Sequence, residues 1–172
     1  LCVLKQFHYN IEEMLRDKAP LFLLLENIQD PGNLGTMLRT GEGAGVSGII
    51  MSRDTVDLYN PKVIRSTMGS IYRVPFYYAD DFAAAVHQVQ QAGVSVYAAH
   101  LRGKNSYACQ DYTKGTAFLI GNEGNGLREE TAELADCYIR IPMEGKVESL
   151  NAAVASSILM YEAHRQRATL EK

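Results

Sequence analysis

Three polar loops that contain glycine each join an apolar, strand-like segment to a helix-like segment. They read NIQDPGNLG at 27–35, IGNEGNG at 120–126 and IPMEG at 141–145, the last running on to SLN at 149–151. Loops at such junctions follow the carboxyl ends of parallel strands, where open α/β proteins place their ligand contacts. The three loops therefore predict an α/β fold with a site assembled from distant segments, and they favour a chemical function over that of a scaffold.

Hydrophobic patterning predicts strands that alternate with helices along the chain. LFLLLE at 21–26 is a continuous apolar run, as expected of a parallel strand that is covered on both faces. The alternation predicts one domain with a mostly parallel sheet between helices. The expected strands are 21–26, 48–52, 71–78, 94–99, 116–120 and 137–141. The expected helices are 7–17, 33–44, a short one from Pro61, 81–92, 127–134 and 149–167.

Size and charge limit the classes of function. A chain of 172 residues that is 47% hydrophobic can form one domain with a substantial core, but not two large ones. Its formal charge of −3 gives no global basic field for nucleic acid, so any RNA contact requires a local patch. The alternative is that the Lys and Arg residues in loops are ordinary solvated surface residues. The candidates in or near loops are Arg53, Lys62, Arg65, Arg73, Arg102, Lys104 and Lys146.

The cysteines and histidines are dispersed. Cys2, Cys109 and Cys137 are odd in number and far apart, so they form neither a disulfide framework nor a CxxC pair. We therefore expect a reduced, cytoplasmic protein without a metal site. No apolar run approaches the roughly 20 residues that a membrane span requires, and no membrane association is expected.

The first loop combines a turn with a helix that is rich in glycine. Pro31 and Gly32 predict the turn, and Asn33 is expected at the N-cap of the following helix. Glycines such as Gly35 weaken a helix, so their presence indicates close approach by another backbone or a ligand. The alternative is that Asn33 only caps the helix and Arg39 only decorates its surface.

The second and third loops resemble a cofactor pocket made of backbone. The glycines at 121–126 let N–H and C=O groups approach a flat ligand such as adenine, although their spacing is not that of the dinucleotide fingerprint. Glu123 is either a surface charge or a positioned carboxylate. Ser149 is expected to cap the last helix, with Asn151 in its first turn, where a polar side chain can serve a ligand. Small residues on that helix indicate tight packing, either across a subunit boundary or wholly inside the domain.

Taken in this order, the three strings resemble the signature motifs of the SpoU (TrmH-like) branch of the SPOUT methyltransferase superfamily. The resemblance spans about 21–167, and NPKVIRSTMGS at 60–70 is similar to the family's connecting segment. It implies S-adenosylmethionine-dependent methylation of a ribose 2′-hydroxyl in structured RNA, with rRNA favoured over tRNA. It also implies an α/β domain with a C-terminal trefoil knot, an exception to the rule that chains do not thread their own loops. Such proteins are homodimers through the knot region and the C-terminal helix.

The resemblance also assigns domains and site residues. It implies a catalytic domain at 21–172, preceded by a lead-in segment at 1–20 that is either a remnant of an upstream RNA-binding domain or a linker. The positions implied for cofactor binding are Gly121, Ile141 and Leu150 through their backbone, with Leu101, Gly103, Gly124 and Met143 lining the site. The polar catalytic set is Asn33, Arg39, Glu123, Ser149 and Asn151. One departure from the family pattern is GEG at 41–43, where alanine is more usual.

Two other classes of protein remain as alternatives. A catalytically silent RNA-binding SPOUT module would be expected to lose Asn33, Arg39 or Asn151, and all three are present. Another nucleotide-binding α/β enzyme would be expected to carry a GxxxxGK[ST] string, which does not occur. For a methyltransferase, we expect Arg39 to remain charged, to stabilise the developing oxyanion and to pair with a phosphate.

Overall fold

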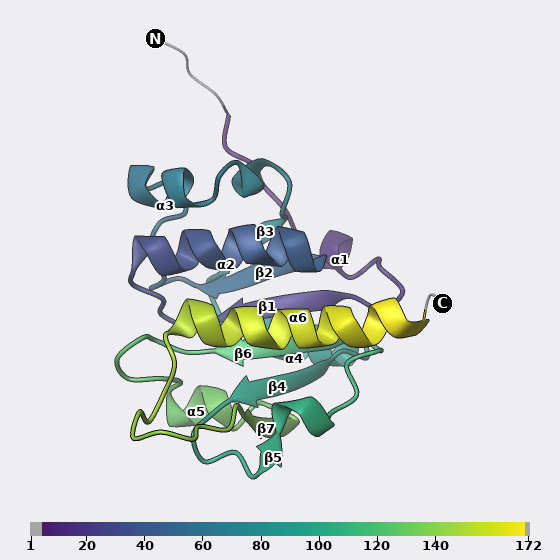
Figure 1. Cartoon of the computed structure of the whole chain (residues 1–172). Coiled ribbons are helices and arrows are strands. Elements are labelled where there is room, and N and C mark those ends of the chain that lie inside the picture. Colours follow the sequence, from purple (N-terminus) through teal and green to yellow (C-terminus); the bar gives the residue numbers. More distant parts are fainter. Residues whose placement is uncertain (1–4, 171–172) are drawn as a thin grey trace.

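The computed structural model describes residues 5–170, which form a seven-stranded parallel sheet with helices on both faces (Figure 1). The strand order is β3-β2-β1-β6-β4-β7-β5, and every pair of neighbouring strands is parallel. The strands are β1 (Leu21–Leu25), β2 (Gly48–Ser52), β3 (Phe76–Ala79), β4 (Ser95–Ala99), β5 (Asn105–Ser106), β6 (Thr116–Ile120) and β7 (Cys137–Arg140). The helices are α1 (Ile11–Met14), α2 (Pro31–Ala44), α3 (Pro61–Ser66), α4 (Phe82–Gln91), α5 (Glu129–Ala132) and α6 (Ala152–Leu170), with 3₁₀ turns η1 (Ser70–Tyr72) and η2 (Tyr107–Cys109).

Strand β1 lies in the middle of the sheet and shows why its sequence is apolar throughout. Its side chains alternate between two cores, because successive residues of a strand point to opposite faces. Leu21, Leu23 and Leu25 pack with residues of α2, α3 and α6, whereas Phe22 and Leu24 pack with residues of α1, α4 and α5. All five side chains are fully buried. The predicted three-layer arrangement is therefore confirmed.

The sheet topology brings the three glycine-bearing loops to one edge. Strand order runs outward from β1 in one direction through β2 and β3, and in the other through β6, β4 and β7. Because the strands are parallel, the segments that follow β1, β6 and β7 all leave from the same edge. The residues concerned are 26–30, 121–128 and 141–151. The fold thus places them together although they lie far apart along the chain.

Some elements differ from the sequence predictions. The helix expected at 7–17 is only one turn, Ile11–Met14, and it begins after Asn10, which is its N-cap. The strand expected at 71–78 is wrong in its first half: the 3₁₀ turn η1 (Ser70–Tyr72) precedes a shorter β3. The helix expected at 127–134 is four residues long. The edge strand β5 was not predicted, because two polar residues, Asn105 and Ser106, give no hydrophobic pattern.

The two helices next to the site, α2 and α6, have other N-cap residues than the sequence predicts. Asp30, not Asn33, caps α2, and its side chain accepts a hydrogen bond from the Asn33 N–H at 2.8 Å. Asn151, not Ser149, caps α6, where its Oδ1 accepts from the N–H groups of Ala153 and Val154. These corrections matter because capping by Asp30 leaves the Asn33 side chain available for other partners.

Glycine in α2 is explained by packing at one position in particular. A Cβ built on Gly35 would lie 1.8 Å from Ser66 Oγ and 2.9 Å from the Val63 carbonyl oxygen of α3. No side chain fits there, so the close approach of another backbone, expected from the sequence, is confirmed at Gly35. The contact sets α3 directly against the start of α2.

Helix α6 packs beside α2 on one face of the sheet (Figure 1). Its inner side carries small or flexible buried residues, among them Ala153, Ser156 and Met160. Its outer side leaves Val154 and Tyr161 about half exposed. The helix is therefore not wholly internal to this chain, and an apolar strip on it faces outward.

The far end of α6 is tied to the opposite edge of the sheet by Arg167. Its guanidinium is half-buried and donates to the carbonyl oxygens of Ala19 (2.8 Å), Tyr112 (2.9 Å) and Lys114 (2.7 Å). The segments that contain these carbonyls lead into β1 and β6. Arg167 thus joins the helix to the amino ends of the two central strands.

Within residues 5–170, no helix is both long enough and apolar enough to span a bilayer. In the same range, no group of three His, Cys, Asp or Glu side chains is arranged to hold a metal ion. Cys109 and Cys137 are free thiols, and Cys2 lies outside the described residues.

We expect Arg167→Leu to lower the free energy of unfolding by about 2–3 kcal/mol, because partly buried carbonyls lose charged donors. Denaturant titration followed by circular dichroism measures this. Arg165→Leu is the matched control, since Arg165 is exposed and, among the residues that the structure describes, its side chain pairs only with Glu162 one turn away. That variant should lose less than about 1 kcal/mol. Equal losses in the two variants would contradict the anchoring role of Arg167.

Candidate functional site

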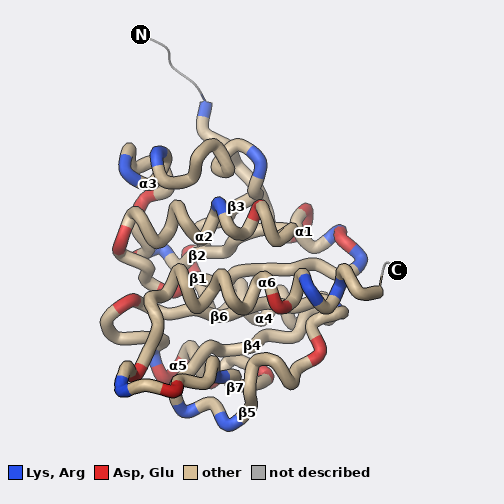
Figure 2. The backbone as a smooth tube through the Cα atoms, in the orientation of Figure 1, with Lys and Arg blue, Asp and Glu red and all other residues tan. Residues whose placement is uncertain are grey.

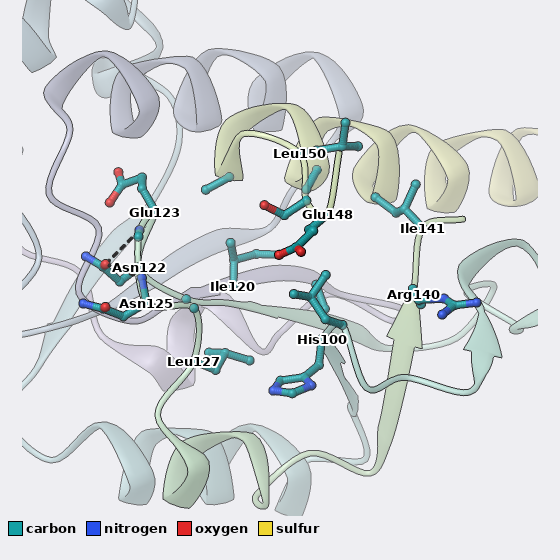
Figure 3. Close-up of a pocket in the computed structure, with 18 of the residues that line it drawn as sticks. His100, Ile120, Asn122, Glu123, Asn125, Leu127, Arg140, Ile141, Glu148 and Leu150 are labelled. Carbon is teal, nitrogen blue, oxygen red and sulfur yellow. Dashed lines mark hydrogen bonds between the residues drawn. The ribbon is translucent and has the colours of Figure 1, made fainter. Parts of the chain in front are cut away.

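A cavity of about 260 Å³ opens at the carboxyl edge of the sheet, between the ends of β4, β6 and β7 and the start of α6 (Figure 3). Its walls come from four separate segments of the chain. They are 99–101, 120–127, 139–143 and 148–155, not every residue of which faces the cavity. The second and third glycine-bearing loops therefore meet here, as the sequence predicts.

The loop at 121–126 is folded tightly on itself. Asn122 and Gly126 exchange backbone hydrogen bonds of 3.0 and 2.9 Å, and Asn122 Oδ1 accepts from the N–H groups of Gly124 and Asn125. A Cβ on Gly121 would lie 2.2 Å from the Gly126 carbonyl carbon, which no relaxation of a side chain could relieve. Glycine is thus required at 121 for the loop to close beside the cavity.

The cavity wall is mostly apolar. Its aliphatic side chains suit a flat, weakly polar ring, while the loop backbone supplies the hydrogen-bonding groups. Burial, and next the neighbouring Arg102, lower the pKa of His100. The imidazole ring, which follows the carboxyl end of β4, is therefore neutral at pH 7. The aliphatic lining residues are Ile120, Leu127, Ile139, Ile141 and Leu150.

A hydrogen-bonded chain of side chains joins the three loops beside this cavity. Glu123 Oε1 accepts from the Asn33 side-chain amide at 3.0 Å and from the Asp30 N–H at 3.0 Å. Its other oxygen accepts from the Gln29 N–H at 3.1 Å. Asn151 Nδ2 then donates to Asn33 Oδ1 at 3.0 Å. One carboxylate therefore ties the first loop to the second, and Asn33 ties the first to the third.

The contacts of Glu123 also fix its charge. Partial burial opposes ionisation, but the hydrogen bonds from Asn33 and from the two backbone N–H groups outweigh it and hold the pKa of Glu123 below its ordinary value. The carboxylate is ionised at neutral pH and its oxygens are occupied by donors. This arrangement suits a group that holds a site together better than one that removes a proton.

A second network lies behind the first, and the sequence reasoning missed it. Glu26, only 1% exposed, accepts from the Arg128 N–H at 2.8 Å and from the Thr131 hydroxyl. The Arg128 guanidinium pairs with Asp54 after β2, and the Asp54 carbonyl accepts from the Gln29 side chain at 2.6 Å. The available signal was a glutamate that directly ends an apolar strand, where a charge requires a partner.

The structure brings most of the sequence-predicted residues together. Leu101, Gly121, Gly124, Ile141, Met143 and Leu150 line the cavity. Gly103 does not line it: this buried residue forms a turn against β7, where a Cβ would lie 2.8 Å from the Ile139 carbonyl carbon. Among the polar set, Ser149 and Glu123 line the cavity, and Asn33, Glu123 and Asn151 border an adjoining hollow. Arg39 lies six residues beyond Asn33 on α2, exposed and outside both linings.

The cations proposed as RNA contacts fall into two groups. Arg53, Arg73 and Arg102 form ion pairs with Asp80, Glu42 and Glu129 respectively. The others are exposed, and within residues 5–170 they form no ion pair: Lys62, Arg65, Lys104 and Lys146. Figure 2 shows Lys and Arg over α3 at one end of the molecule and around β5 at the other.

Fold and site together define a parallel α/β domain whose ligand pocket is made from loops at the carboxyl edge of the sheet. Comparison with known proteins identifies the class. Residues 20–161 match the model of the SpoU rRNA Methylase family, and the chain belongs to this family. It has the α/β knot fold of SpoU methyltransferases, with a trefoil knot in its C-terminal part, as the resemblance implies.

Individual relatives are similar over most of this chain. The 23S rRNA (guanosine(2553)-2′-O)-methyltransferase RlmP of Bacillus subtilis is 37% identical over 81% of the chain and 56% of its own length. The SpoU methyltransferase AviRb of Streptomyces viridochromogenes, solved with the cofactor AdoMet, is 31% identical with a TM-score of 0.86, over 93% of this chain and 62% of its own. A structure described as addressing 2-OH methylation of C/U34 on tRNA is 32% identical with a TM-score of 0.81, over 89% of this chain and 99% of its own. The chain spans between half and two thirds of the length of the curated relatives.

We expect Glu123→Gln to lower the melting temperature most at neutral pH and progressively less below about pH 4.5, the ordinary pKa of glutamate. The folded-state pKa of Glu123 is lowered, so its stabilising contribution is complete above the ordinary pKa and is lost as pH falls through the folded value. Thermal melting of both proteins across this range is the measurement. Glu148→Gln serves as control, because Glu148 lines the same cavity and its side chain makes no hydrogen bond within residues 5–170. A pH-independent difference for Glu123→Gln would show that the carboxylate charge is not what holds the loops.

Proposed function

We propose that the protein transfers a methyl group from S-adenosylmethionine to a ribose 2′-hydroxyl of structured RNA, with rRNA favoured over tRNA. The observation that carries this proposal is the hydrogen-bonded set of Asn33, Glu123 and Asn151 beside a glycine-walled cavity. Family membership supports it, as do the names of relatives that act on 23S rRNA and the neighbours solved with AdoMet.

The residues around the cavity fit such a cofactor. Gly121 and Gly124 bring backbone to the cavity wall, and the aliphatic walls from Ile120, Ile141 and Leu150 can enclose a purine ring. We propose that Gly121, Ile141 and Leu150 hold the ring through their backbone, with Leu101 and Met143 lining the pocket. Gly103 would act indirectly, by holding the turn after β4 against β7. When bound, S-adenosylmethionine supplies an electrophilic methyl group on a sulfonium.

The protein's own contribution is to position the ribose and stabilise its oxygen as the proton leaves. The hydroxyl has a pKa far above neutral, so a group must stabilise the developing negative charge. We assign this to Arg39, which remains protonated and also pairs with an adjacent phosphate. Ser149 and Asn151 would orient the ribose, and Asn33 would orient Asn151 through their 3.0 Å hydrogen bond. Glu123, ionised and fully hydrogen-bonded, holds this set together.

The substrate is proposed from relatives and from chemistry. RlmP and RlmB relatives are named for 23S rRNA, which favours rRNA, and with such a substrate we propose a cytoplasmic protein. The neighbour of nearly equal length is described for tRNA, so tRNA is the comparison in the test below. The exposed cations over α3 would contact the RNA backbone.

We also propose a catalytic domain at 21–172, with 1–20 as a lead-in segment, and a homodimer through the knot region and α6. The outward apolar strip of α6, with Val154 and Tyr161 half exposed, supports the dimer. Light scattering after size-exclusion chromatography measures the state, and a monomer for the wild type would contradict it.

The function is tested by two measurements on the same protein. Calorimetry should detect binding of S-adenosylmethionine and of its demethylated product. Transfer of labelled methyl groups should occur to 23S rRNA, or to tRNA if the substrate inference is wrong, and the product should carry a 2′-O-methyl ribose by reverse-transcription mapping. Cofactor binding without transfer to either RNA would favour a silent module. Absence of cofactor binding in folded protein would contradict the proposal outright.

For Arg39→Lys we expect kcat to fall by about 100-fold with an unchanged pH optimum, because lysine keeps the charge but loses the planar fork of donors. Cofactor affinity should not change, since Arg39 lies outside the cavity lining. Rates across the pH range are the measurement. If lysine restored full activity with a lower pH optimum, Arg39 would be the proton acceptor, and its role as a permanent cation would be wrong.

A further inference from the structure

Arg39 and Glu42 lie three residues apart on α2, so they share one face of that helix. Side chains at this spacing form ion pairs when both are free to do so. An acidic group beside the proposed phosphate-binding arginine would compete with the RNA for it. Glu42 belongs to the GEG segment that departs from the family pattern, and its partners decide whether this competition occurs.

The carboxylate of Glu42 is fully engaged elsewhere. Its Oε2 accepts from the Ser70 hydroxyl at 2.6 Å and from Arg73 Nη2 at 3.0 Å, and its Oε1 accepts from Arg73 Nε. The hydrogen bond from Arg73, and next that from Ser70, lower the pKa of Glu42 to about 2. The carboxylate is therefore ionised at neutral pH, and both of its oxygens are hydrogen-bonded to residues in or directly after η1.

Arg39, by contrast, has no hydrogen bond or ion pair with any residue of 5–170 and is exposed to solvent. The cluster of Arg39, Glu42 and Arg73 carries a net charge of +1. Removal of Arg73 would leave Glu42 with only a hydroxyl donor and would bring the net charge to zero. Arg39 would then be the nearest cation on the same helix face.

We propose that Arg73 is a positioning residue that occupies the Glu42 carboxylate and so keeps Arg39 available for an RNA phosphate. This proposal rests on the proposed function of Arg39. Arg73 acts through Glu42 and does not itself contact the RNA. The activity that is lost when Arg73 is removed is therefore lost because the Glu42 carboxylate becomes free to pair with Arg39.

A double-mutant cycle tests the proposal through kcat/KM for RNA. Arg73→Ala should lower kcat/KM by about five-fold, the limit for an exposed ion pair that substrate must displace. Glu42→Gln, which keeps a hydrogen-bonding side chain near Ser70, should not lower it. The double variant should return to within about two-fold of wild type, since the competing charge is gone. If the ion pair were needed only for structure, Glu42→Gln would lower kcat/KM as well, and the double variant would stay as impaired as the single variants.

Arg65→Ala is the matched control, because Arg65 is an exposed cation of α3 with no ion pair within residues 5–170. Glu42→Gln should not rescue any loss caused by Arg65→Ala. If the double variant of Glu42 and Arg73 stayed as impaired as Arg73→Ala alone, Arg73 would contact the RNA itself and the proposal would be wrong.

A second readout is independent of activity. NMR should show that exchange of the Arg39 Nε proton with water slows in Arg73→Ala and recovers in the double variant. Unchanged exchange in Arg73→Ala would overturn the proposal. If the NMR pattern held while wild-type protein neither bound S-adenosylmethionine nor methylated RNA, the proposed function would fail and the occupation of Glu42 by Arg73 would stand. Thermal melting of each variant confirms that the comparison is between folded proteins.

Discussion

The geometry of the site depends on one interaction, the hydrogen bonding of the Glu123 carboxylate to the first loop. This carboxylate crosses from the segment after β6 to the segment after β1 and accepts three hydrogen bonds there, from Asn33 and from two backbone N–H groups. Asn33 can then reach Asn151 at the start of α6. The carboxylate acts together with a second direct contact between these loops, in which the Asn122 side-chain amide donates to the Asn27 carbonyl oxygen at 2.8 Å. The hydrogen bonds of Glu123 that join the loops therefore also position Asn33 and Asn151, two of the residues proposed for catalysis.

The parallel sheet makes this interaction possible at modest cost. Strands β1 and β6 are neighbours in register, Leu25 opposite Ile120, so the loops that follow begin side by side. The conformational entropy of bringing 27–35 to 120–126 is offset by burial of the strands, not by the polar contacts themselves. Polar bonds of the usual strength can therefore select one arrangement of the loops. The packed core brings the loops close together, and the hydrogen bonds between them fix their relative orientation.

Much of this arrangement could be predicted from the sequence. Apolar runs gave the central strands, and glycine-bearing junctions gave the edge at which the site lies. The polar set, which includes Asn33, Glu123 and Asn151, was implied by the resemblance of the three loops to the motifs of a known family. What failed depends on contacts between distant residues. Asp30 could not be distinguished from Asn33 as the cap of α2, since both side chains suit that position. The sequence around Glu26 indicates that this charge needs a partner, but no local pattern identifies Arg128 as that partner or β7 as the contact of Gly103.

Helix α6 connects the stability of the domain to the geometry of the site. At its start, Asn151 uses one side-chain oxygen to cap the helix and its amide to hold Asn33. At its end, Arg167 binds carbonyls that lead into β1 and β6. The helix is therefore fixed at both edges of the same two strands from which the first and second loops leave. A shift of α6 along the sheet would break the Asn151 contact before it disturbed the core, because one hydrogen bond tolerates less displacement than a face of small side chains. The position of the third loop thus follows from the packing of the whole helix and not from the loop's own sequence.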